Sequence, residues 1–95
     1  MRVHWTNTAI EHLLAIYEYI AKDSPMYAQR MIDKLIRHSE QITIFSLSGR
    51  MVPEYEVQDI REVIEKPYRI IYRIKPYQID VLAVVHGAQL LPPEL

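Results

Sequence analysis

Hydrophobic and polar positions change their spacing along the chain, and each change predicts a new element. Val3 and Trp5 alternate with polar residues, which is the two-residue period of a half-buried strand. Thr8 followed by Glu11 resembles a capping box and predicts that a helix starts there. Beyond it the apolar residues recur every three or four positions, as on one face of a helix, at Ile10, Leu13, Leu14, Tyr17 and Ile20.

A second helix is predicted directly after the first. Ser24 is a preferred N-cap residue, and Pro25 suits the first helical position because its missing N–H is not needed there. This helix should fade near Phe45. Because the link is so short, the two helices should form an antiparallel hairpin. The apolar stripe of the second helix consists of Ala28, Met31, Ile32, Leu35, Ser39 and Ile42.

The spacing changes again after a predicted turn at Ser48-Gly49. Three runs rich in β-branched and aromatic residues follow, at 60–66, 68–75 and 79–86, separated by proline-containing turns, and they predict an antiparallel meander. Residues 79–85 are apolar on both faces, so we expect this strand to be covered by the helices on one side. The C-terminal tail or a partner chain should cover the other side.

These elements predict an α+β fold with the order β-α-α-β-β-β. The N-terminal strand and an antiparallel two-helix hairpin would pack on a small, twisted, mainly antiparallel sheet. The length of 95 residues suits one domain, and we expect it to span residues 1–95.

Composition excludes several classes of protein. No apolar run approaches the roughly 20 residues of a membrane span, and no signal peptide opens the chain, so we expect a cytoplasmic protein without a membrane partner. The sequence contains no cysteine, and its histidines, at 4, 12, 38 and 86, lack the spacing of metal ligands. We therefore expect neither a metal site nor a cofactor.

Charge argues against a nucleic-acid-binding protein. The net charge is −1, and residues 49–76 contain six basic and five acidic side chains. Proteins that bind nucleic acids usually gather a basic excess on one face, since neutralising phosphates supplies much of their affinity. The even balance instead favours solvated ion pairs or contacts with a protein partner.

Several short motifs together resemble the RelE/ParE superfamily, the small toxins of bacterial type II toxin–antitoxin modules. The resemblance covers nearly the whole chain, and its strength lies in the order and spacing of motifs that are weak singly. They are Val3-x-Trp5, the turn Phe45-x-x-x-Gly49-Arg50-x-Val52-Pro53-Glu54, Ile60-Arg61-Glu62, Tyr68-Arg69-Ile70-Ile71-Tyr72-Arg73-Ile74, and Val84-Val85-His86-Gly87.

The resemblance implies two different activities, because a shared fold does not fix function. RelE-like members are ribosome-dependent mRNA endonucleases. Cleavage of RNA without a metal needs a base, an acid and positive charge on the phosphate. Glu54 and Arg69 match the acid/base glutamate and phosphate-binding arginine of the YoeB-like nucleases in position, and His86 lies near their C-terminal histidine. Arg61 is a further candidate on the neighbouring strand.

Other positions depart from the nuclease pattern. The lysine positions of the RelE-type nucleases are here Ile60 and Glu62, and a carboxylate repels phosphate. The basic residue and tyrosine that these nucleases keep near the C-terminus are replaced within Ala88-Gln89-Leu90-Leu91. Gln89 also departs from the arginine that many ParE-like members show after His-Gly.

Each candidate also has a purely structural interpretation. Arg61 and Glu62 are neighbours on a strand, so each would meet an opposite charge across the sheet. Arg69 would be a half-exposed edge residue or an antitoxin contact, and Glu54 a solvated loop residue. His86 would be a hydrogen-bonded histidine at the end of a buried strand.

We favour the ParE-like interpretation, a toxin that inhibits DNA gyrase by protein–protein contact and needs no cofactor. A cognate antitoxin would hold it inactive in a toxin–antitoxin hetero-oligomer. An mRNA endonuclease that acts on the ribosome, and an inactive antitoxin-binding paralogue, stay open as alternatives. Target contacts are predicted at Arg50, Arg73 and Gln89. Antitoxin contacts are predicted at Leu13, Tyr17, Ile20, Arg69, Tyr72, Leu90 and Leu91.

Overall fold

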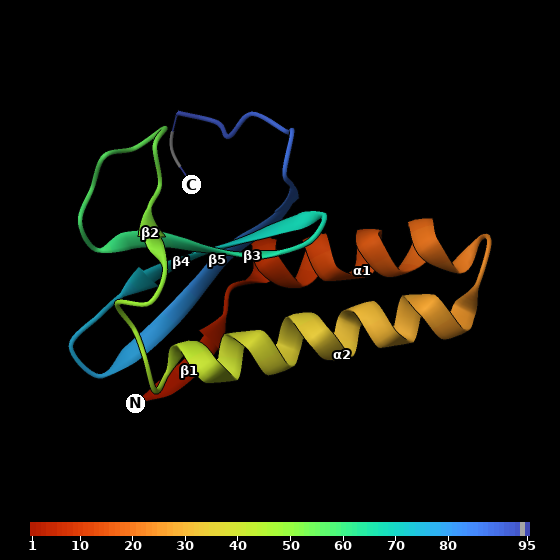
Figure 1. Ribbon diagram of the computed structural model, residues 1–95, viewed down its shortest axis with the longest axis horizontal. Helices are drawn as coiled ribbons and strands as arrows, with labels where there is room; N and C mark the ends of the chain where they lie inside the picture. The colour runs from red at the N-terminus through yellow and green to blue at the C-terminus, as the bar shows by residue number, and fades with distance from the viewer. Residues whose placement is uncertain (94) are drawn as a thin grey trace.

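A computed structural model describes residues 1–93 and 95, and the elements follow the predicted order (Figure 1). Of the predicted domain 1–95, only Glu94 lies outside the described residues. The predicted α+β class is confirmed. In chain order the elements are β1 (Arg2–Trp5), α1 (Asn7–Ala21), α2 (Pro25–Ile42), β2 (Arg50–Met51), β3 (Ile60–Glu65), β4 (Tyr68–Ile74) and β5 (Gln78–His86).

The strands form one sheet in the order β1-β5-β4-β3-β2. β3, β4 and β5 are the predicted antiparallel meander, and β2 pairs antiparallel with β3 at one edge. β1 pairs parallel with β5 at the other edge, from Arg2 opposite Gln78 to Trp5 opposite Val81. The first and last strands of the chain are therefore neighbours, and β5 lies inside the sheet.

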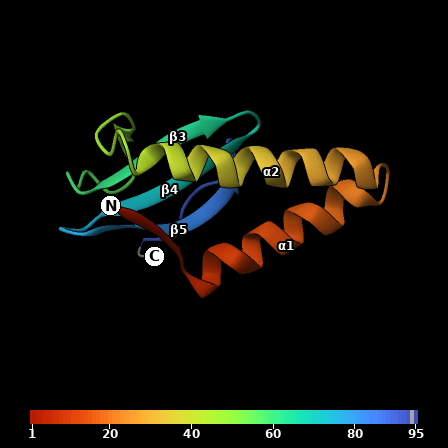
Figure 2. The ribbon, with the colours of Figure 1, turned by 90° about the horizontal axis from the view of Figure 1, so that it is seen from below.

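The helical hairpin covers one face of the sheet and extends beyond it (Figures 1 and 2). α2 begins as predicted: the Ser24 hydroxyl accepts a hydrogen bond from the Tyr27 N–H at 3.2 Å, and Pro25 is the first helical residue. Its predicted inward face is confirmed, since Ala28, Leu35, Ser39 and Ile42 are buried and Met31 and Ile32 are partly buried.

α1 differs from its prediction in both its start and its orientation. Thr6, not Thr8, is the N-cap: its Oγ1 accepts the Ala9 N–H at 3.2 Å and donates to the Val81 carbonyl at 2.9 Å. Ala9 and Ile16 are the buried residues of the helix. The predicted stripe is wrong at its outer positions, because 43% of Ile10 and 58% of Leu14 are exposed.

Two hydrophobic cores lie on the two faces of the sheet. Beneath the helices, Ile16 and Leu35 pack against strand residues such as Ile70 and Val84. The second core is covered by the loop after β2 and by the C-terminal tail, whose Leu91 packs against it. The prediction that β5 is covered on both faces is confirmed. The second core contains Val52, Ile60, Ile71, Ala83 and Val85.

No helix in the described part of the chain is both long enough and apolar enough to cross a membrane.

Candidate functional site

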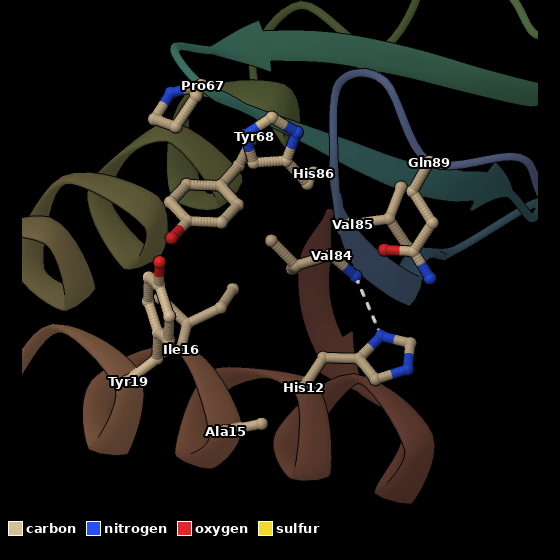
Figure 3. Close-up of a pocket in the computed structure, with 10 residues that line it drawn as sticks. All are labelled: His12, Ala15, Ile16, Tyr19, Pro67, Tyr68, Val84, Val85, His86 and Gln89. Atoms are coloured by element: carbon tan, nitrogen blue, oxygen red, sulfur yellow. Dashed lines mark hydrogen bonds between the residues drawn. The ribbon is translucent and has the colours of Figure 1, made fainter.

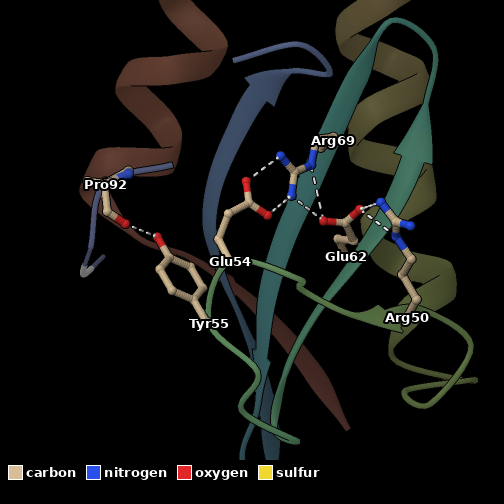
Figure 4. Close-up of polar contacts among 6 residues, drawn as sticks. All are labelled: Arg50, Glu54, Tyr55, Glu62, Arg69 and Pro92. Atoms are coloured by element: carbon tan, nitrogen blue, oxygen red, sulfur yellow. Dashed lines mark hydrogen bonds and ion pairs between the residues drawn. The ribbon is translucent and has the colours of Figure 1, made fainter. Parts of the chain in front are cut away.

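Two arginines and two glutamates alternate in a chain of ion pairs on the sheet face turned away from the helices (Figure 4). The Glu62 side chain is fully buried between them. Arg50 Nε donates to Glu62 Oε2 at 2.8 Å, and Arg69 Nε donates to Glu62 Oε1 at 3.1 Å. Arg69 also holds Glu54 in a bidentate pair, with both Nη–Oε distances 2.9 Å.

The sheet register and the loop after β2 bring these charges together. Arg50 lies directly opposite Glu62, and Arg69 is on the adjacent strand β4. The loop then returns Glu54 over the same face (Figure 4). Only 7% of the Arg69 side chain is exposed, and burying an unpaired guanidinium is strongly unfavourable. The two carboxylates compensate its charge.

Hydrogen bonding from Arg69 holds the pKa of Glu54 below its ordinary value. The same bonds to Glu54, together with those to Glu62, raise the pKa of Arg69 and keep it charged. Arg69 Nε, Nη1 and Nη2 all donate to these two carboxylates. A phosphate could therefore reach this guanidinium only by displacing a carboxylate.

These contacts decide between the structural interpretations of the candidates. Glu62 meets opposite charges across the sheet, as predicted. The expectation of a half-exposed edge Arg69 is wrong, because this arginine is buried. Glu54 is exposed, as expected of a loop residue, but its carboxylate is paired with Arg69. Arg61 donates instead to the backbone carbonyls of Gln58 at 3.0 Å and Gly49 at 3.1 Å, so its predicted opposite-charge partner is wrong as well.

His86 lies on the other face of the sheet. It is opposite Tyr68 in the β4–β5 register and meets that ring edge-on, with centroids 6.1 Å apart. Both residues line a pocket of about 500 Å³ between α1 and the end of β5 (Figure 3). In this pocket His12 Nδ1 accepts the Val84 N–H at 3.1 Å. His86 Nδ1 accepts the Ala88 N–H at 3.4 Å, as expected for a hydrogen-bonded histidine, although the residue is exposed.

The three predicted nuclease residues are therefore not brought together. Glu54 and Arg69 are in contact on the face away from the helices, whereas His86 faces the helix side. Strand geometry enforces this separation: Arg69 is opposite Val85, and successive side chains point to opposite faces.

Tyr72, a predicted antitoxin contact, is fully buried. Its hydroxyl donates to the Ser46 carbonyl at 2.8 Å and accepts the Gly49 N–H at 3.1 Å, and burial raises the pKa of the phenol. In this structure neither Tyr72 nor the buried Arg69 offers a surface to a partner. Tyr72 instead fixes the turn that leads into β2.

The other residues predicted to contact a partner differ in their exposure to solvent. Leu13, Tyr17 and Ile20 are partly buried on α1, and Leu91 is partly buried in the tail. Leu90 is 85% exposed, the Arg50 side chain is 66% exposed, and Gln89 is exposed beside the His86 pocket.

An apolar groove on the outside of the hairpin includes two of the predicted antitoxin contacts, Leu13 and Tyr17. It has a volume of about 190 Å³ and is lined by Ile10, Leu13, Leu14, Tyr17 and Ile32. Four of these residues belong to the predicted apolar stripe of α1. Ile10 and Leu14 of this stripe are exposed, whereas Leu13 and Ile20 pack against the core.

Among the described residues, no group of three or more His, Cys, Asp or Glu side chains is arranged to hold a metal ion.

Comparisons with known proteins agree on one class of protein. The family model for the ParE toxin of the type II toxin–antitoxin system parDE matches residues 3–91. "Putative toxin Y4kP" of Sinorhizobium fredii is 31% identical over 96 residues, covering 99% of this chain and 96% of the relative. "Toxin RelE2" of Caulobacter vibrioides is 31% identical over 90 residues, covering 94% of this chain and 98% of the relative.

A solved structure has the same architecture. The "Chromosomal ParDE TA system from P. aeruginosa" contains a chain with a TM-score of 0.75 and 25% identity, covering 90% of this chain and 95% of that one. Fold and relatives together define a toxin of type II toxin–antitoxin systems within the RelE/ParE superfamily. Within that superfamily, the chain belongs to the ParE toxin family.

Proposed function

We propose that this toxin arrests growth by binding a DNA topoisomerase such as gyrase in the cytoplasm, and not by cleaving mRNA. The separation of His86 from the Glu54–Arg69 pair carries this proposal. Metal-free cleavage of RNA needs an acid and a base within hydrogen-bond reach of the same reacting phosphate. Groups on opposite faces of one sheet cannot serve one phosphate together.

The state of Arg69 supports the same conclusion. Stabilising a phosphate in the transition state requires a positive charge aimed at empty space where the oxygens will lie. Arg69 is instead buried and bound by two carboxylates. The ion-pair chain would hold the loop after β2 on the sheet, which is a structural role.

A ribosome-dependent mRNA endonuclease is the second candidate, and one observation favours it. The predicted glutamate and arginine do meet, at 2.9 Å, on one face of the sheet. One relative also carries the name RelE2. In this alternative, ribosome binding would have to separate the pair and supply a further acid.

We also propose that a cognate antitoxin covers the apolar groove on the outside of the hairpin. The solved ParDE system is named as a toxin–antitoxin assembly. An amphipathic helix binds such a groove by placing its apolar face against it. Leu14 is 58% exposed and Ile10 is 43% exposed. A bound antitoxin would remove these side chains from water, and burying apolar surface is favourable. Among the predicted antitoxin contacts, Leu13 and Tyr17 line this groove.

Expression of single variants in bacteria tests the proposed mode of action. His86→Gln should arrest growth as the native chain does, because the histidine has no catalytic role. His38→Gln provides a matched control on α2. Loss of growth arrest in a folded His86→Gln protein, together with mRNA cleavage by the native chain, would establish the nuclease instead.

A further inference from the structure

The loop after β2 forms one wall of a second pocket, of about 340 Å³, on the sheet face away from the helices. Arg73 of β4 lies in it, and its Nε is buried without a hydrogen-bond partner among the described residues. Unpaired buried polar atoms are uncommon in native proteins, and each calls for a physical explanation. The other lining residues include Tyr55, Val57, Ile60 and Pro93.

Among the described residues, two carboxylates lie near Arg73, and each is engaged by other groups. Asp80 lies directly opposite Arg73 in the sheet register, but it binds Lys75 Nζ at 2.6 Å and Gln78 Nε2 at 2.6 Å. Glu54 also lines the pocket, yet both of its oxygens are held by Arg69. The charge of Arg73 therefore has no ion-pair partner within 4.0 Å among the described residues.

We propose that this pocket receives an aspartate or glutamate side chain of the toxin's protein target. The inference rests on the proposed function, because it assumes that the toxin acts by binding a protein. A carboxylate entering the pocket would pair with the Arg73 guanidinium, because the residue as a whole is only partly buried. Charge-assisted bonds of this kind are among the strongest in proteins. Tyr55, Val57 and Ile60 line the same pocket and would contact the carbon atoms of the incoming side chain. Arginine is also enriched among the hot-spot residues of protein interfaces.

A protein carboxylate fits this pocket better than a nucleic-acid phosphate. The loop that borders the pocket carries three acidic residues, Glu54, Glu56 and Asp59. A nucleic-acid strand brings a phosphate at every nucleotide and would pass these carboxylates, whereas a single acidic side chain need not. The lining also contains aliphatic and aromatic groups, from Tyr55, Val57 and Ile60, beside its charged groups. These can contact the carbon atoms of a glutamate side chain.

Four variants at two positions test the proposal. Arg73→Gln removes the charge, Arg73→Glu reverses it, and Arg73→Lys keeps it without the guanidinium. Arg37→Gln, on the exposed side of α2, is the matched control for charge. Each is assayed for growth arrest on expression, for binding to purified DNA gyrase, and for folding by thermal melting.

We expect Arg73→Gln to weaken gyrase binding at least about tenfold and Arg73→Glu to weaken it further, since like charges repel. Arg73→Lys should lie between the native chain and Arg73→Gln, and Arg37→Gln should bind normally. Should Arg73→Glu fail to fold, the order native, Lys, Gln still tests the role of the charge and of the guanidinium.

The outcomes separate this inference from the proposed function. If folded Arg73→Gln and Arg73→Lys arrest growth and bind gyrase as the native chain does, the pocket is not a target site, although gyrase inhibition can still hold. A second outcome is that the native chain arrests growth without binding gyrase or cleaving mRNA, and that this arrest is lost when Arg73 is replaced. The pocket would then be a target-binding site, and gyrase would be the wrong target. If the native chain cleaves mRNA or arrests nothing, the proposed function and this inference both fall.

Discussion

Arg69 and His86 face opposite sides of the sheet, although Arg69 is directly opposite Val85, the residue before His86. Arg69 points into the ion-pair chain with Glu54 and Glu62, and His86 points to the pocket beside α1 (Figures 3 and 4). Moving them to the same face would require a one-residue shift of the β4–β5 register, which would also exchange the residues of β5 between the two cores. The separation is therefore fixed by the core.

Neutralising Glu62 should destabilise the fold. Glu62→Gln leaves Arg69 with Glu54 as its only carboxylate and leaves Arg50 without an ion pair among the described residues. Removing one partner of a buried pair usually reduces stability by about 3 to 5 kcal/mol, and we expect about 3 kcal/mol because Arg50 can turn to water. Urea unfolding at neutral pH measures the loss, with exposed Glu40→Gln as a control. Equal stability of the two variants would show that the ion-pair chain adds nothing.

Gly49 should tolerate no side chain. A Cβ at this position would lie 2.5 Å from the Glu62 carbonyl oxygen and would also overlap the Tyr72 hydroxyl. Overpacking of this kind usually destabilises by about 1 to 3 kcal/mol, and the rigid backbone partner places Gly49→Ala at the upper end. Gly87→Ala is the matched control, because its Cβ would meet only the Pro67 carbonyl, at 3.2 Å. Thermal melting should rank native, Gly87→Ala, then Gly49→Ala; the reverse order of the two variants would contradict the predicted packing of the turn.

The Glu54–Arg69 pair should make stability depend on pH. Because Arg69 holds the pKa of Glu54 in the folded protein below the ordinary 4.5, the pair contributes fully above that pH. The contribution is lost as pH falls through the lowered folded-state value. Glu54→Gln should therefore be less stable than the native chain at neutral pH, and the difference should shrink as the solution is acidified.

Urea unfolding over a series of pH values measures this dependence. Glu18→Gln, an exposed change on α1, should run parallel to the native curve. A difference between Glu54→Gln and native that stays constant down to about pH 3 would show that Glu54 titrates normally.

The apolar groove should govern antitoxin affinity. Leu14→Asp places a charge where a partner's apolar face would lie, and we expect affinity for the cognate antitoxin to fall at least about tenfold, since desolvating the charge is unfavourable. Leu47→Asp is the control: Leu47 is 70% exposed and lies outside the groove. Isothermal titration with the purified antitoxin measures both. Unchanged affinity for a folded Leu14→Asp would place the antitoxin elsewhere.

The fold was predicted well where the signal lies in residues that are close together in the sequence, such as a helix cap or an apolar stripe. The Ser24-Pro25 start of α2 and its buried stripe were correct, and the three long strands lie within one residue of their predicted bounds. The start of α1 was missed because Thr6 and Thr8 both resemble N-caps. Thr6 is favoured as the N-cap by a contact with β5, in which its hydroxyl donates a hydrogen bond to the Val81 carbonyl. The two-residue β2 is too short to produce a periodic pattern.

The site was less predictable, because its contacts join segments that are distant along the chain. Burial of Arg69 depends on Glu62, seven residues away, and on Glu54, fifteen residues away. Strand alternation puts Arg69, Ile71 and Arg73 on one face. No local pattern shows that a loop pairs its glutamate with Arg69 and not with Arg73. The family motifs likewise could not show that His86 lies across the sheet from Glu54.

Incubating purified toxin with DNA gyrase and supercoiled plasmid tests the central claim most directly. After detergent and protease treatment, we predict linear DNA that increases with toxin dose, equally with His86→Gln, and that disappears when the cognate antitoxin is added first. Unchanged supercoiling and no linear DNA, from a preparation that arrests growth in cells, would contradict the account.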